Sequence, residues 1–120
     1  MHEPSGATLL TDAPVDNHGR GESFSPTDLL ATSLGTCMMT IMGIAAERHG
    51  IDLAGMTAET TKEMATDPPR RIAALRTRIT VPLPADHPQR ALLEQAALGC
   101  PVHRSIAAGI DAAVEFVWRG

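Results

Sequence analysis

The longest apolar stretch of the chain lies between Pro26 and Arg48, where leucine, isoleucine, methionine and alanine recur on nearly every side of a helix. Ser25 is a favourable N-cap, Pro26 suits the first helical position, and Gly50 follows the run as a terminating glycine. A helix that is apolar all round is buried. In a chain of 120 residues, this pattern predicts a central helix over residues 26–50, covered by a sheet on one side and by a second subunit on the other.

Alternating polar and apolar positions predict strands elsewhere in the chain. Leu75 and Ile79 are expected to point to one face of a strand, while Arg76 and Arg78 point to the other. The pattern predicts an α+β fold with a mostly antiparallel sheet packed on the long buried helix. We expect one domain over residues 1–120, in which residues 1–25 form a short N-terminal strand and loop. The other predicted elements are strands at 7–11, 57–65, 75–81 and 113–118, and helices at 86–98 and 100–108.

Composition argues against several classes of function. A net charge of −4 and few aromatic residues do not suit a nucleic-acid-binding protein, which needs a basic patch and stacking side chains. The N-terminus lacks the basic and apolar regions of a signal peptide, and no apolar run is expected to reach the ~20 residues that span a bilayer. We therefore expect a cytoplasmic protein with no nucleic-acid or membrane partner. Two cysteines in that compartment are more often redox-active, metal-binding or buried than a structural disulfide.

Cys100 is the first candidate for a reactive thiol. It precedes Pro101, which suits the first position of a helix, so the sequence predicts Cys100 at the N-cap. Backbone N–H groups would then face the sulfur, with His103 and Arg104 close by, and this setting lowers the pKa of a thiol. The alternative is a small buried apolar residue, and the residues alone leave both interpretations open.

Cys37 lies in the middle of the predicted central helix, between Thr36 and Met38. This position is typical of a core residue, and burial there would raise the pKa of the Cys37 thiol. Periodicity alone does not make it a nucleophile.

Two segments resemble the motifs of one family. The run from Ser25 to Cys37, SPTDLLATSLGTC, is similar to the first motif of the OsmC/Ohr family (osmotically inducible protein C-like and organic hydroperoxide resistance proteins), in which a buried helix started by proline carries the reactive cysteine. The run from Cys100 to His103, CPVH, resembles the second motif, in which a Cys-Pro pair at a helix start supplies a second thiol. The resemblance extends from about Ser25 to the C-terminus and is closer to an OsmC-like branch than to a typical organic hydroperoxide resistance protein.

The resemblance implies an OsmC-like fold that forms an intertwined homodimer with two active sites at its interface. It also implies a peroxidase of the oxidative-stress response. Cys37 would attack an organic hydroperoxide and become a sulfenic acid, and Cys100 would condense with it to a disulfide. An external dithiol or small thiol would then reduce the disulfide, so no cofactor or metal is expected.

The family resemblance also implies supporting residues. Family peroxidases hold the thiolate with an arginine near the N-terminus, positioned by a glutamate early in the central helix. Arg20 precedes the predicted helix, with Glu22 beside it as an orienting group. Thr27 occupies the position of that glutamate in the best-characterised branch, and Asp28 matches the acidic position of another branch. His103 is a further supporting candidate, beside Cys100.

Two other functions stay open at this point. Cys37, Cys100 and His103 would need one more ligand to hold zinc, and the cysteines lack the C-x-x-C spacing typical of zinc sites. The second alternative is a non-catalytic OsmC-like stress protein that binds an apolar ligand at the dimer interface. A fold does not by itself fix a function, and the absence of the family's glutamate at Thr27 keeps this alternative open.

Overall fold

The computed structural model describes all 120 residues, which divide into two compact units, residues 1–30 and residues 31–120. The first contains one short 3-10 helix, η1 (Val15–Asn17), and the beginning of α1 (Pro26–Arg48). The predicted strand at 7–11 is wrong, because a strand needs a partner ladder and these residues have none. Side-chain bonds replace the ladder, and the Ser23 hydroxyl donates to the Leu10 carbonyl at 2.8 Å.

Helix α1 begins where the sequence predicts, through a reciprocal pair of hydrogen bonds. The Asp28 backbone N–H donates to the Ser25 hydroxyl at 3.0 Å, and the Ser25 backbone N–H donates to an Asp28 carboxylate oxygen at 2.9 Å. This is a capping box with aspartate in the place of glutamate, and it satisfies two backbone donors at the helix start. At the other end, Gly50 has a φ of +65°, which lets the chain turn out of the helix.

The second unit contains a three-stranded sheet in the order β1-β2-β3. β1 (Thr57–Met64) pairs antiparallel with β2 (Ile72–Val81), whereas β2 pairs parallel with β3 (Val114–Trp118). A mostly antiparallel sheet was expected. The parallel pair arises because α2 (Arg90–Leu98) and α3 (Pro101–Ser105) form a crossover between β2 and β3, and a crossover returns the chain in the same direction.

Both crossover helices are shorter than the sequence predicts. Residues 86–89 form a turn rather than the start of α2, and the His87 backbone N–H donates to the Pro84 carbonyl at 3.0 Å. α3 ends at Ser105 because Ile106 has extended backbone angles. These differences leave the predicted order of elements from α1 onward unchanged.

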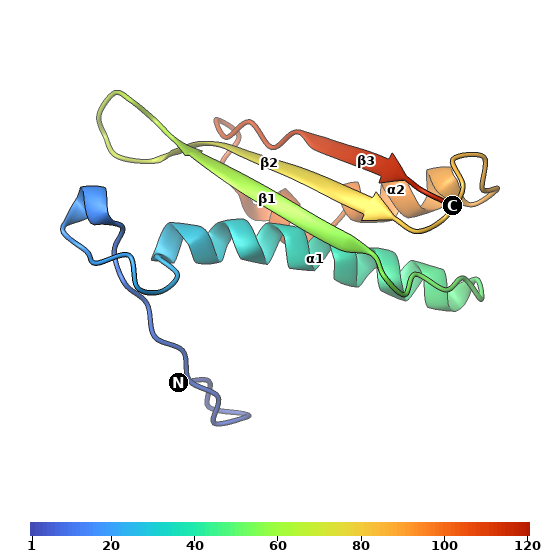
Figure 1. Ribbon diagram of the computed structural model, residues 1–120, viewed down its shortest axis with the longest axis horizontal. Coiled ribbons are helices and arrows are strands. Elements are labelled where there is room, and N and C mark those ends of the chain that lie inside the picture. Colours follow the sequence, from blue (N-terminus) through green and yellow to red (C-terminus); the bar gives the residue numbers. More distant parts are fainter. The chain divides into compact units, whose positions relative to one another are not determined.

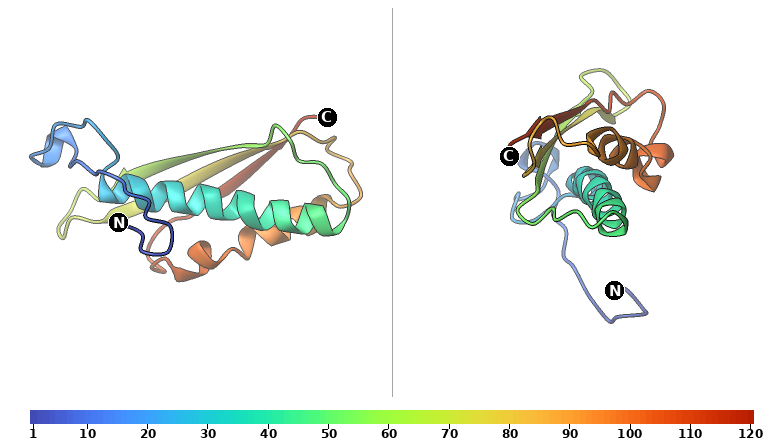
Figure 2. Two further views of the ribbon diagram at one scale, coloured as in Figure 1. Left: turned by 90° about the horizontal axis from the view of Figure 1, so that it is seen from below. Right: turned by 90° about the vertical axis from the view of Figure 1, so that its right-hand side faces the viewer.

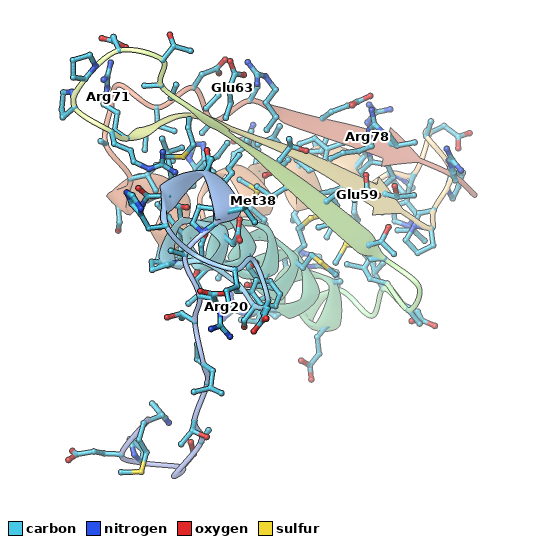
Figure 3. The ribbon with its side chains drawn as sticks, turned by 60° about the vertical axis from the view of Figure 1, so that its left-hand side comes forward. Arg20, Met38, Glu59, Glu63, Arg71 and Arg78 are labelled. Carbon is cyan, nitrogen blue, oxygen red and sulfur yellow. The ribbon has the colours of Figure 1, made fainter.

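Helices α2 and α3 lie beside the part of α1 that belongs to the second unit, and together they cover one face of the sheet (Figures 1 and 2). Fully buried side chains fill the space between the layers, including Leu34, Met38 and Met42 of α1 and Leu75 and Ile79 of β2. The opposite face of the sheet carries charged side chains. Arg78 donates to Glu115 at 3.0 Å there, and Figure 3 shows Arg78 and Glu63 on this face and Met38 between α1 and the sheet.

Only one side of α1 is buried within a single chain. Its buried residues are Ala31, Leu34, Gly35, Met38, Met42 and Ala46, whereas Ile44 is 42% exposed. No charged residue stands between Asp28 and Glu47, so by length and composition alone α1 is apolar enough to cross a membrane. This differs from the expectation that no run is long enough. Length and apolar composition are weak evidence that a helix spans a membrane, because the core helix of a soluble protein can have both.

Gly35 sets how closely α1 approaches β1. A Cβ added at Gly35 would lie 2.8 Å from the Thr60 side-chain oxygen, which is hydrogen-bonded to the Thr77 hydroxyl at 3.1 Å. A side chain at this position would therefore separate the helix from the sheet or break the Thr60–Thr77 bond. Gly43, two turns further along α1, has nothing within 4 Å of the same added atom.

The two glycines provide a matched test of this close approach. Gly35→Ala should be less stable than Gly43→Ala by about 1–3 kcal/mol, because both gain helix propensity but only the first is overpacked. Urea unfolding followed by circular dichroism measures the difference in the free energy of unfolding. Equal stability of the two variants would show that α1 has room to move away from β1.

Candidate functional site

Cys100 occupies the N-cap of α3, as the sequence predicts. Its sulfur accepts a hydrogen bond from the His103 backbone N–H at 3.2 Å, and Pro101 stands at the first helical position. The Cys100 side chain is fully buried in the core cluster, where Leu93 and Ala97 of α2 also lie. Cys100 is therefore a buried thiol with a backbone donor aimed at its sulfur.

Cys37 lies on α1 and packs against the same core cluster, but its side chain is partly exposed. It is also an interaction partner of Cys100, since the two side chains are within hydrogen-bonding reach. Both thiols are free in this structure. Residues 63 positions apart in sequence thus form a pair of adjacent thiols, one buried and one reachable from solvent.

The pKa of the Cys100 thiol is raised above its ordinary value, and burial is the main cause. The hydrogen bond from His103 acts in the opposite direction, and the neighbouring Cys37 thiol raises the pKa further. The sequence leaves two interpretations of Cys100 open, a thiol with a lowered pKa at an N-cap and a small buried residue. The structure favours the second, because burial outweighs the backbone donors and no cationic side chain contributes to the shift of the Cys100 pKa.

The other candidate residues lie at three places in the structure: the loop before α1, the start of α1, and α3. Arg20 and Glu22 lie in the loop before α1, and the backbone N–H groups of both donate to an Asp12 carboxylate oxygen, at 3.1 and 3.0 Å. They belong to the unit of residues 1–30. Asp28 caps α1 through Ser25 and so has a structural role there. His103 acts on Cys100 through its backbone N–H rather than its imidazole.

Three side chains that the sequence analysis did not single out hold α2 against β3. Trp118 Nε1–H donates to a Glu94 carboxylate oxygen at 2.9 Å, and Arg90 Nε–H donates to the same atom at 3.0 Å. The Arg90 guanidinium also lies over the Trp118 ring, 5.4 Å from its centre. The spacing of Arg90 and Glu94 on one helix face was readable from sequence, but the partner on β3 was not. This cluster fixes the helix that leads into Cys100.

Two hollows lie beside the helices that carry the cysteines, and neither is lined by a cysteine. One of about 400 Å³ lies beside α3 and is lined by His103, Ile106, Ile110, Asp111 and short alanine side chains. A smaller one of about 140 Å³ lies between α1 and β1, at Thr36, Met39 and Thr60. No three side chains of the histidine, cysteine, aspartate or glutamate type converge as metal ligands would.

A family model described as OsmC-like protein matches residues 19–115. The chain belongs to the OsmC-like family. The matched region includes both cysteines, Arg20, β1, β2 and the first two residues of β3. No curated protein sequence matches this OsmC-like protein.

Solved structures of OsmC-like and organic hydroperoxide resistance proteins are similar to this chain. A Psychrobacter arcticus protein assigned to the osmotic stress and detoxification response is 52% identical, with a TM-score of 0.81, over 88% of this chain and 77% of that chain. A Legionella pneumophila organic hydroperoxide resistance protein is 17% identical, with a TM-score of 0.72, over 88% and 78%. A Vibrio cholerae protein assigned to organic hydroperoxide resistance, with captopril in one of its active sites, is 19% identical, with a TM-score of 0.72, over 88% and 73%. The last two show that the fold is shared.

The raised pKa of Cys100 leads to a pH prediction. In a Cys37→Ser variant, alkylation of the remaining thiol by iodoacetamide should reach half its maximal rate at a higher pH than for free cysteine, because burial disfavours the thiolate. In urea the midpoint should return to the ordinary value. The unfolded chain loses this proton first, so folding stability should fall as the pH rises through the ordinary thiol pKa. A native midpoint at or below that of free cysteine would contradict the prediction.

Proposed function

We propose that this OsmC-like protein is a thiol-dependent peroxidase that reduces organic hydroperoxides in oxidative-stress defence. The observation that carries the proposal is the contact between the Cys37 and Cys100 thiols, one partly exposed and one buried. Peroxidases of this chemistry need an accessible thiol for attack and a second thiol beside it for resolution. Family membership and the organic hydroperoxide resistance proteins among the structural relatives support the same function.

The proposed reaction has two steps on the enzyme. The Cys37 thiolate attacks the terminal oxygen of the hydroperoxide, the O–O bond breaks, and the alkoxide leaves and takes a proton to become an alcohol. The Cys100 thiolate then attacks the Cys37 sulfenic sulfur and displaces hydroxide, which leaves a Cys37–Cys100 disulfide. Because burial keeps Cys100 protonated at neutral pH, the second step depends on loss of its proton, which the His103 backbone N–H assists.

The roles proposed for the remaining residues follow the resemblance to the family's peroxidases. Arg20 is proposed to hold the Cys37 thiolate and polarise the peroxide, with Glu22 orienting the guanidinium, since a fixed cation next to a thiol favours its ionised form. Asp28 is not part of this proposal because its carboxylate caps α1. An external dithiol or small thiol is proposed to reduce the disulfide, and the protein is proposed to act in the cytoplasm without a resident cofactor.

A homodimer is part of the same proposal. The apolar side of α1 that the sheet leaves uncovered includes Ile44, which is 42% exposed, with Ile41 and Ala45 partly buried beside it. A helix with no charged residue over this length is normally covered on all sides. A second copy of the chain offers the same surface, and so the two copies of α1 are proposed to meet there.

The peroxidase proposal predicts a defined change of mass. Reduced protein treated with one equivalent of cumene hydroperoxide should lose both free thiols and about two hydrogens of mass, because one intramolecular disulfide forms. Intact-mass spectrometry and a thiol count measure this change. Two thiols that stay free after prolonged exposure would contradict the proposal and favour the non-catalytic stress protein that binds an apolar ligand.

Four variants sharpen this measurement. Cys100→Ser should stop at a Cys37 sulfenic acid, which dimedone traps, while Cys37→Ser should not react. Arg20→Ala should slow the loss of thiols about a hundredfold, the usual cost of removing one group that stabilises charge in the reaction. Arg119→Ala, which removes an exposed arginine outside the proposed site, is the matched control and should react like the parent protein.

The dimer proposal predicts a mass of twice 12.7 kDa in solution. Ile44→Glu should shift the protein toward the monomer, because it replaces about 1.5–3 kcal/mol of apolar burial per side chain with a buried charge. Ile44→Val should stay dimeric. Light scattering coupled to size-exclusion chromatography measures both, and a parent protein that elutes as a monomer would contradict the proposal.

A further inference from the structure

We propose that the external reductant attacks the disulfide at Cys37, never at Cys100, so that the mixed disulfide forms on α1 and Cys100 is the leaving thiolate. This inference rests on the proposed Cys37–Cys100 disulfide, but not on a hydroperoxide as the oxidant that forms it. It specifies which sulfur the reducing partner has to reach. A disulfide has two sulfurs that a thiolate can attack, and the two differ sharply in their surroundings here.

The first argument is access. Cys100 has no exposed surface, whereas Cys37 is partly exposed. Attack on a disulfide proceeds in line, from the side opposite to the leaving sulfur. Any approach to Cys100 has to enter the protein interior, because this side chain is fully buried in the core cluster with Leu93 and Ala97. Within one chain, an approach to Cys37 does not require the helices to separate, because this side chain is partly exposed.

The second argument is the fate of the leaving sulfur. When the S–S bond breaks, Cys100 receives the electron pair, and the His103 backbone N–H already points at its sulfur from 3.2 Å. The Val102 backbone N–H is a further donor to the same atom. Cys37 lies in the interior of α1, where backbone N–H groups are used within the helix. The protein therefore provides donors for a thiolate at Cys100.

One effect acts against this direction of attack. A thiol with a raised pKa is a slower leaving group, and the pKa of Cys100 is raised by burial. This effect changes a rate by a modest factor. Access decides the outcome because a sulfur enclosed by the core cannot be attacked at all until α2 and α3 move away from α1.

The step balances as a thiol exchange. A reductant thiolate forms a bond to the Cys37 sulfur, the Cys37–Cys100 bond breaks, and the Cys100 thiolate takes up a proton from solvent. A second thiolate attacks the reductant sulfur of the mixed disulfide and releases the Cys37 thiolate. Two reductant thiols are oxidised to one disulfide, and two electrons pass to the protein.

Trapping the mixed disulfide in the full chain tests the proposal directly. The Cys37–Cys100 disulfide is made with diamide, exposed briefly to excess 2-mercaptoethanol, quenched in acid, and blocked with N-ethylmaleimide. Trypsin separates the two cysteines, because Cys37 falls between Arg20 and Arg48 and Cys100 between Arg90 and Arg104. The adduct is expected on the Cys37 peptide, with maleimide on the Cys100 peptide, in at least about a tenfold excess over the reverse pattern.

The outcomes separate this proposal from the proposed function. An adduct on Cys100, or an even distribution between the two peptides, would overturn the inference while leaving peroxide reduction intact. Failure of diamide to form the disulfide would also overturn it. A protein that forms the disulfide with diamide but not with cumene hydroperoxide, and still carries the adduct on Cys37, would support the inference while the peroxidase proposal fails.

The single-cysteine variants supply a second readout that does not depend on the disulfide. Native Cys100→Ser, in which Cys37 remains, should react with dithiodipyridine at least about tenfold faster than native Cys37→Ser, in which Cys100 remains. The two rates should converge in urea, where access is equal. Equal native rates, with circular dichroism showing that both variants are folded, would contradict the argument from access.

Discussion

The contact between one side of α1 and the three-stranded sheet is the constraint on which the other features of the second unit depend. Leu34, Met38 and Met42 point from the helix into the core, and Gly35 lets the helix backbone come close to Thr60 on β1. This contact fixes the rotation of α1 about its own axis. Once the rotation is fixed, Cys37 lies at the border between the buried and uncovered sides of α1.

The second thiol is positioned by a separate part of the structure. The crossover from β2 to β3 places α2 and α3 beside α1, and the Arg90–Glu94–Trp118 cluster holds α2 to β3. Gly99 and Cys100 follow α2 directly, and this places the Cys100 sulfur in the core beside Cys37. Its chemistry is then a competition between burial, which favours the thiol, and the backbone N–H groups of α3, which favour the thiolate. Burial is the stronger effect in the reduced protein.

In the proposed mechanism, this asymmetry gives the two cysteines different tasks. A partly exposed sulfur on a rigid helix can meet a hydroperoxide and, later, a reductant. A buried sulfur with backbone donors is protected from both and reacts with its neighbour. Apolar side chains exclude water from Cys100. Another apolar part of α1 has no cover within one chain, and the proposed second subunit would supply that cover. One apolar helix, α1, thus contributes to the core, carries Cys37 and presents the surface at which the dimer is proposed to form.

The sequence by itself determined the elements whose signals are local. The Ser25 cap, Gly50 and the uncharged run between them define α1, the alternation around Leu75 and Ile79 defines β2, and Pro101 places Cys100 at an N-cap. The tertiary structure decided what depends on distant partners. The segment at 7–11 lacks a strand to pair with, β3 runs parallel to β2, and the pKa of Cys100 is raised rather than lowered. Caps and periodicity are properties of neighbouring residues, whereas strand pairing and burial depend on segments far apart in the chain, and this is why only the three-dimensional structure could decide them.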